Sequence, residues 1–351
     1  MALLHQVGWS AEQNAKAKII YSSGLENKAT AGDPDAQADL GMCYFEGLGV
    51  AKDIKQAVKW YEKSAKQGHA WAQASLGKCY QTGTGVAKDD QKSVTWYRKS
   101  AEQGNKWAQL ELGVCYDKGR GVAKNEQEAV KWYTKSAEQG VSIAQCNLGV
   151  CYANGIGVAQ DYEKASKWYR KSAEQGDEWA QMHLGWCYLN GKGVQQDERE
   201  AVKWLTKSAE QGNQDSQNGL GWCYRNGKGV QKNDAEAVKW YRKSAAQGDA
   251  EGQNGVAWIL STSEDAKIRD GKEAVGWALK ALKTAGENDA FALSTLASAY
   301  AEQGDFSTAV SIQEKAIRNL KNKMQTDEFL NHLHSYKEKK PWRETPKEKG
   351  F

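Results

Sequence analysis

The chain has 351 residues, of which 40% are hydrophobic and 26% are charged, so it is too apolar for a disordered tail and long for one globular core. Its net charge of +4 is small for this length and gives no basis for predicting nucleic-acid binding. No apolar run is long enough to cross a bilayer, so membrane insertion is not expected.

The N-terminal residues show no targeting signal. Met1–Ser10 lacks the basic start and apolar stretch of a secretory signal, although a fragment of an exported protein would look the same. Seven cysteines in such a chain are expected to be reduced thiols, which favours a cytoplasmic protein. Residues 24–31 align with the second helix of the repeats that follow, so residues 1–30 are interpreted as a degenerate N-terminal cap or a truncated repeat.

Beyond residue 30 the sequence repeats itself with a constant step of 36 residues. A glycine, a leucine and a tryptophan position keep this step, from Gly32 to Gly248, Leu40 to Leu220 and Trp60 to Trp240. Six clean copies therefore occupy residues 31–250, and a fixed period of this length is typical of stacked repeat architectures.

Each copy predicts two helices. In the first copy, Leu40, Cys43 and Tyr44 recur at helical spacing and form one apolar stripe, and Gly47 suits the left-handed end of that helix. In the second helix, Trp60 and Tyr61 belong to the buried face. The unit is therefore a helical hairpin.

Capping residues indicate where the helices begin. The second helix is expected to start after an Asp or Asn whose side chain accepts the unpaired amide hydrogens of the first turn. These residues are Asp53, Asp89, Asn125, Asp161, Asp197 and Asn233. Most first helices also follow an Asp or Asn, and His69 and Val141 are the exceptions.

Small residues at two positions predict close helix packing. Gly41 and Ala57 are expected where two helix axes approach to about 8 Å. A single hairpin leaves its apolar faces in water, so neighbouring hairpins must stack to bury them. The predicted fold is all-α: a right-handed α/α superhelix, or solenoid, of stacked hairpins with one concave and one convex side.

The first copy, Ala36–Tyr61, has the pattern Ala-Gln-x-x-Leu-Gly-x-Cys-Tyr-x-x-Gly-x-Gly-Val-x-x-Asp-x-x-x-Ala-x-x-Trp-Tyr. This pattern resembles the Sel1-like repeat family, a longer-looped relative of the tetratricopeptide repeats. The resemblance implies an α/α superhelix and an adaptor or scaffold role in assembling complexes.

The C-terminal part departs from this pattern. Trp258 keeps the register, but Ser261–Lys272 replaces the usual loop, so residues 251–289 are predicted to be a degenerate repeat. Residues 290–320 resemble an ordinary tetratricopeptide repeat, as found in bacterial proteins. Residues 321–351 are predicted to form a capping helix and a Lys-rich tail.

Few residues suggest catalysis. Six cysteines share one position on the buried stripe, which predicts core packing, with neither disulfides nor metal ligation. The resemblance also brings in cysteine-rich relatives described as β-lactamases, but their paired cysteines within each repeat do not occur here. Ser75–Lys78 matches Ser-x-x-Lys without companion motifs, and no phosphate-binding loop is present. We therefore expect no enzyme activity, no metal and no small-molecule cofactor.

A row of lysines runs along the predicted convex helices, from Lys63 to Lys243. We interpret this row as a solvated face whose lysine stems cover apolar surface. The alternative is a binding site for an acidic partner.

The variable positions of the first helices are more apolar than a solvated face should be. By comparison with tetratricopeptide repeats, these positions line a concave groove. The residues concerned are Trp71, Trp107 and Trp179 at one position, Leu110, Cys146 and Met182 at a second, and Trp186, Trp222 and Trp258 at a third. Exposed aromatic surface often marks a partner site. The alternative is that the curvature of the stack buries these rings between repeats.

The sequence therefore predicts a non-catalytic scaffold that holds a peptide or a partner helix in this groove. The predicted partner-binding residues are Trp71, Trp107, Trp179, Met182, Trp186, Trp222, Arg225 and Trp258. One alternative is glycan binding by the same rings, with Asn154, Asn190, Asn226 and Arg225 as hydrogen-bonding groups. A β-lactamase-like enzyme is the last alternative.

Overall fold

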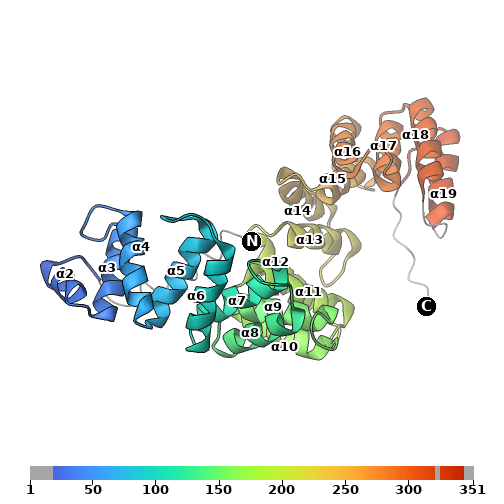
Figure 1. Ribbon diagram of the computed structural model, residues 1–351. Coiled ribbons are helices and arrows are strands. Elements are labelled where there is room, and N and C mark those ends of the chain that lie inside the picture. The colour runs from blue at the N-terminus through green and yellow to red at the C-terminus, as the bar shows by residue number, and fades with distance from the viewer. Residues whose placement is uncertain (1–18, 321–324, 344–351) are drawn as a thin grey trace. The chain divides into compact units, whose positions relative to one another are not determined.

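The computed structural model describes residues 19–320 and 325–343, and within these ranges it contains helices and no strand. Each repeat forms the two predicted helices, and consecutive hairpins pack in tandem within each part of the chain (Figure 1). The prediction of an all-α repeat solenoid is confirmed.

The chain divides into two compact units, residues 1–177 and 178–351. The described helices of the first unit are α2 (Ser23–Thr30), α3 (Pro34–Glu46), α4 (Ile54–Lys66), α5 (Ala70–Thr82), α6 (Asp90–Glu102), α7 (Lys106–Lys118), α8 (Glu126–Glu138), α9 (Ser142–Asn154) and α10 (Tyr162–Glu174). Helix α2 packs against α3, as the second helix of a preceding repeat would. Residues 1–18 of the predicted N-terminal cap lie outside the described residues.

The second unit continues the same alternation of first and second helices. Its described helices are α11 (Glu178–Asn190), α12 (Glu198–Glu210), α13 (Gln214–Asn226), α14 (Asp234–Ala246), α15 (Ala250–Thr262), α16 (Gly271–Ala285), α17 (Ala290–Glu302), α18 (Phe306–Asn319) and α19 (Thr326–Lys337). Helices α17 and α18 form the hairpin expected at 290–320, and α19 packs against both. Residues 321–324 and 344–351 of the predicted cap and tail lie outside the described residues.

Side-chain caps begin the helices where the sequence predicts them. The Oδ1 atom of Asp53 accepts a hydrogen bond from the amide of Gln56 at 3.0 Å. Equivalent bonds are made by Asp89, Asn125, Asp161, Asp197 and Asn233. The expectation that His69 breaks the pattern is wrong, because its Nδ1 accepts from the amide of Ala72 at 3.1 Å. Val141 makes no side-chain cap, as expected.

The two helices of a hairpin touch at a repeat position that is occupied by glycine. A Cβ atom on Gly41 would lie 2.6 Å from the ring of Tyr61 and 3.2 Å from the carbonyl oxygen of Ala57. Carbon atoms in contact are about 3.5–4.0 Å apart, so only glycine lets the tyrosine ring approach the helix this closely. Gly47 ends the first helix with a φ of 79°, in the left-handed conformation predicted for it.

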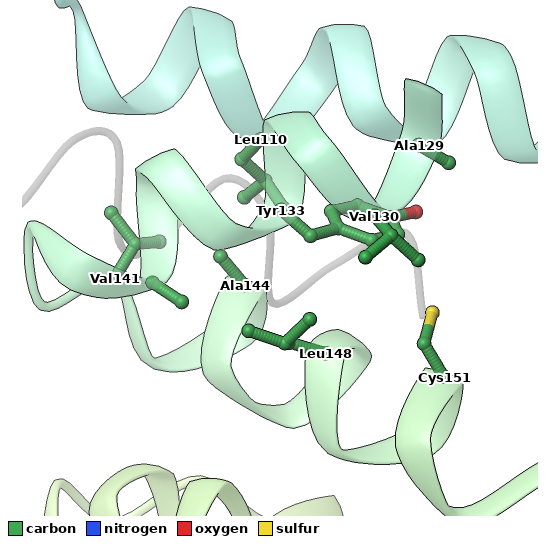
Figure 2. Close-up of a cluster of buried hydrophobic side chains, with 9 residues drawn as sticks. Leu110, Ala129, Val130, Tyr133, Val141, Ala144, Leu148 and Cys151 are labelled. Carbon is green, nitrogen blue, oxygen red and sulfur yellow. The ribbon is translucent and has the colours of Figure 1, made fainter. Parts of the chain in front are cut away.

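The hydrophobic core lies between consecutive hairpins. Figure 2 shows one such cluster, in which Leu110 of α7, Tyr133 of α8 and Leu148 of α9 point toward one another. Each of these side chains is at most 3% exposed. A repeat without its neighbour would lose this contact, which is why a single hairpin cannot bury its own apolar surface.

A ladder of glutamines, which the sequence analysis did not identify, ties the hairpins together. Gln67 donates from Nε2 to Oε1 of Gln37 at 2.8 Å, and Gln37 in turn donates to the carbonyl oxygen of Ala29 in the preceding helix at 3.0 Å. Further glutamine pairs of this kind join positions 73 and 103, 109 and 139, 145 and 175, 181 and 211, and 217 and 247. The ladder satisfies amide groups that burial would otherwise leave without partners.

Candidate functional site

A groove of about 860 Å³ opens within the second unit. Helices α11, α13, α15, α17 and α19 all contribute to its lining. The first four of these are the first helices of successive hairpins, so equivalent repeat positions meet along the same surface.

Aromatic side chains line this groove. Trp186, Trp222 and Trp258 come from α11, α13 and α15 and occupy one repeat position, 36 residues apart. Trp222 is 39% exposed, and Phe291 of α17 is 48% exposed. Rings with that much exposure leave apolar surface in contact with water. A ligand that covers them removes this surface from water, which makes the rings favourable contact points.

A glycine in the middle of α13 makes room for one of these rings. A Cβ atom on Gly219 would lie 3.1 Å from Cζ2 of Trp186, so the indole rests on the bare backbone. Glycine inside a helix costs about 1 kcal/mol relative to alanine. The close approach of Trp186 gives this cost a structural reason.

Four carboxylates line the groove, and they come from three different hairpins and α19. They are Asp215, Glu251, Asp289 and Glu328. Partial removal from water raises the pKa of Glu251, and the negative charges of Asp249 and Asp215 raise it further. The groove is therefore a region where negative charge is crowded.

Arg225 is the one arginine or lysine among the lining residues, and its guanidinium lies over the ring of Trp258 at 5.4 Å from the centroid. The same indole contacts His332 of α19, with the ring centroids 5.6 Å apart. His332 is 1% exposed, and its Nδ1 lies 3.2 Å from the hydroxyl of Ser294. Trp258 is thus in contact with two groups of its own chain, Arg225 and His332.

Two buried amides complete the lining. The Oδ1 atoms of Asn218 and Asn254 are buried and have no hydrogen-bond partner among the described residues. The Nδ2 atom of Asn218 donates to Asp249, which also accepts from the amide of Gly252. Each amide oxygen is therefore a buried acceptor behind the groove surface, without a partner in the described part of the chain.

Five of the eight predicted partner-binding residues line this groove: Met182, Trp186, Trp222, Arg225 and Trp258. Met182 is only 6% exposed, so it forms part of the groove wall but offers a ligand little accessible surface.

Trp71, Trp107 and Trp179 do not line the groove. Trp71 packs edge-on against Tyr61 at 5.5 Å between ring centroids, and Trp107 packs against the core cluster around Tyr133. The Nε1 atom of Trp179 is buried and has no hydrogen-bond partner among the described residues. Trp71 and Trp107 therefore follow the alternative interpretation, in which rings at this repeat position pack between helices.

The prediction for the second groove position is wrong for two of its three residues. Leu110 and Cys146 were expected to face a groove, but they are 1% and 6% exposed. Leu110 belongs to the core cluster shown in Figure 2. Their position faces the next hairpin, so an apolar residue there is buried by its neighbour.

The asparagines considered for glycan binding are used by their own helices. Asn154, Asn190 and Asn226 donate from Nδ2 to the carbonyl oxygens of Val150, Trp186 and Trp222, at 3.0, 2.9 and 2.8 Å respectively. Each bond satisfies a carbonyl of the last helical turn. The groove amides, Asn218 and Asn254, were missed, although their change from the Ala and Leu of earlier copies is visible in the sequence.

The lysine row lies over tryptophan rings. Lys63 places its Nζ 3.8 Å from the ring centroid of Trp60, three residues earlier. The same contact is made by Lys99, Lys135, Lys171, Lys207 and Lys243 at 3.9–4.7 Å. The row therefore covers apolar surface with cations, as the first interpretation has it.

The residues considered for catalysis are engaged in the core. All seven cysteines are free and buried, as predicted for the six of the buried stripe but not for Cys146, and burial raises the pKa of Cys79 to about 12. Lys78 donates to the buried carboxylate of Glu111 at 3.1 Å, and Ser75 is 7% exposed. A buried thiol that resists ionisation is a poor nucleophile.

Within residues 19–320 and 325–343, no group of three or more His, Cys, Asp or Glu side chains is arranged to hold a metal ion. In the same ranges, no helix has the length and apolar character needed to span a bilayer.

The Sel1 repeat model matches seven segments of the chain: 34–69, 72–105, 108–141, 142–177, 180–213, 214–249 and 250–283. The chain belongs to the Sel1 repeat family. The last match covers most of the segment whose sequence departs from the repeat pattern.

Solved structures of other Sel1 repeat proteins are similar to this chain. One is c5321, a protective antigen present in uropathogenic Escherichia coli strains, with 30% identity, a TM-score of 0.66, and coverage of 92% of this chain and 76% of that one. Another is a Sel1 repeat protein from Oxalobacter formigenes, with 38% identity, a TM-score of 0.56, and coverage of 62% and 89%. No match was found among curated proteins. Sel1 repeat proteins are typically non-catalytic scaffolds, generally for protein interaction, and this chain is a Sel1 repeat scaffold.

Proposed function

We propose that the groove of the second unit binds a segment of a partner protein, either an extended peptide or a helix, and that the chain acts as a non-catalytic adaptor. One observation carries this proposal: three tryptophans at one repeat position line the same groove, and Trp222 and Phe291 are exposed there. Exposed aromatic residues in a concave surface are the residues that most often dominate protein binding.

A peptide fits this groove better than a glycan does. The asparagines that would serve a sugar beside the rings, Asn190 and Asn226, donate to carbonyl oxygens of their own helices. The crowded carboxylates also favour a positively charged ligand, and neutral sugars carry no positive charge.

A binding selection with matched variants tests the proposal. Random octapeptides displayed on phage are selected on the wild-type protein, and the affinities of the selected peptides are measured by fluorescence anisotropy. The Trp222→Ala variant should bind them more than tenfold less tightly, because a truncated aromatic anchor costs about 2 kcal/mol or more. Trp71→Ala, outside the groove, should bind them as the wild type does.

Stability measurements separate a lost contact from a lost fold. Trp222→Ala should unfold at nearly the wild-type urea concentration, whereas Trp132→Ala, which removes a ring only 6% exposed, should cost about 3–5 kcal/mol. Peptides that bind wild type and Trp222→Ala equally well would exclude the groove. Quenching of tryptophan fluorescence by N-acetylglucosamine oligomers, with no peptide binding, would favour the glycan alternative.

We also propose that the chain works in a reducing compartment such as the cytoplasm. Seven free, buried cysteines support this proposal, since an oxidising compartment favours paired cysteines. Disulfide-linked peptides in mass spectra of the protein isolated from its native source would argue against it.

A further inference from the structure

This inference rests on the proposed function and specifies its ligand. We propose that the segment held in the groove is cationic, with an arginine or lysine side chain stacking on the exposed ring of Trp222 and positive charge facing the carboxylates of Asp215 and Glu251.

The charge of the groove is opposite to that of the whole chain. Four carboxylates and one arginine line the groove, whereas the chain carries a net charge of +4. The negative charge is therefore concentrated here and does not reflect an acidic protein. A groove with one sign of charge attracts segments of the other sign and rejects segments of its own.

The repeat register shows where this charge comes from. Asp215 and Glu251 occupy the position that tryptophan fills at Trp71 and Trp107. In α13 and α15 this position therefore presents a carboxylate, whereas α11 keeps a tryptophan there, Trp179; in α13 a tryptophan lies seven residues later, at Trp222. A cation is attracted both by a carboxylate and by the face of an indole ring.

Trp222 differs from the tryptophans of the second helices in lacking a cation of its own. The rings from Trp60 to Trp240 each carry a lysine ammonium at 3.8–4.7 Å from the centroid. Over the ring of Trp222, no lysine or arginine of the described residues lies within contact distance, and the ring is 39% exposed. The fold thus pairs these rings with cations elsewhere and leaves this one for a ligand.

The carboxylates are likewise available. Asp249 is occupied by the amide of Gly252 and the side chain of Asn218, so it serves the local fold. Asp215 and Glu251 form no ion pair with the described residues; partial burial raises the pKa of Glu251, and repulsion from Asp249 and Asp215 raises it further. A cation bound beside Glu251 would offset that repulsion, so cation binding and ionisation of Glu251 favour each other.

The first test compares the peptides selected by two matched double variants. Asp215→Asn with Glu251→Gln removes two charges from the groove, and Glu102→Gln with Glu138→Gln removes two exposed charges from the first unit. Octapeptides selected on the wild type and on the Glu102/Glu138 control should be enriched in arginine and lysine relative to the input library. Octapeptides selected on the groove variant should lose that enrichment.

The second test removes charge from the ligand at constant shape. A selected peptide is synthesised with citrulline in place of arginine, or with Nε-acetyl-lysine in place of lysine. The wild type should bind the neutral peptide at least tenfold less tightly, which corresponds to about 1.4 kcal/mol. The groove variant should discriminate between the two peptides much less, because the partner charges are already absent.

The outcomes distinguish this inference from the proposed function. Selected peptides that need Trp222 but show no basic enrichment, or that bind equally well with citrulline, would overturn the cationic ligand and leave peptide binding intact. A selection that yields no peptide dependent on Trp222 would overturn the proposed function, and the cationic ligand with it.

Discussion

The glycine at the helix crossing gives a substitution whose effect can be worked out from distances. In Gly221→Ala, the new Cβ of α13 would lie 2.7 Å from Cδ1 and Cε1 of Tyr241 on α14. Tyr241 is 6% exposed and has little room to move. Overpacking of this kind costs about 1–3 kcal/mol, while alanine gains about 1 kcal/mol of helix propensity over glycine. Because the contact involves several ring atoms, we expect a net loss of about 1–2 kcal/mol.

The same substitution at a different glycine supplies the control. Gly276 lies in α16 of the same unit, and a Cβ atom there would meet nothing within 4 Å. Gly276→Ala should therefore stabilise the protein by about 0.5–1 kcal/mol through helix propensity alone. Urea unfolding followed by circular dichroism should show the midpoint falling for Gly221→Ala and rising for Gly276→Ala. If both midpoints rise, close contact with Tyr241 is not the reason for glycine at this position.

Two further predictions concern titrating groups whose pKa is shifted by burial. Burial lowers the pKa of His183 from 6.5 to about 4, so folding favours its neutral form. The stability that results is present above pH 6.5. It is lost as the pH falls toward 4, by up to about 3 kcal/mol. His183→Asn, which copies Asn147 from the preceding repeat, should flatten the fall in urea midpoint between pH 7 and pH 4.5; an unchanged fall would assign it to other groups. Burial also raises the pKa of Cys115 and Cys223 to about 12, so a thiol reagent at pH 8 should label few cysteines in the native protein and all seven in denaturant. Rapid labelling of the native protein would contradict their burial.

Much of the local structure could be predicted because it depends on short stretches of chain. Asp53 caps the amides directly after it, and Gly47 adopts the left-handed conformation that ends its own helix. The His69 cap escaped prediction because imidazole is an uncommon capping group, although the same three-residue geometry carries it. Asn226 escaped for the opposite reason, since a local bond to its own helix uses the amide that appeared free for a ligand.

The candidate site was less predictable because it depends on which hairpin faces which residue. Trp71 and Trp222 lie in equivalent first helices, at different positions, and each was expected to face a groove. Trp71 meets the ring of Tyr61, whereas Trp222 remains 39% exposed. The repeat pattern alone does not give the exposure of either ring, since exposure depends on the side chains of the neighbouring helices.

The amino-acid sequence by itself therefore determined the period, the helices, their caps and the residues of the core stripe, because caps and apolar periodicity act over a few residues of one chain segment. The tertiary structure decided which variable positions became wall, core or open surface. Met182 and Leu110 share one repeat position, yet Met182 lines the groove and Leu110 lies in a core cluster. It also brought Glu328 of α19 into the groove beside repeats that precede it by many residues. These assignments depend on packing between separate hairpins, and packing of that kind is set by shape and volume across the contact and not by the pattern of either helix alone.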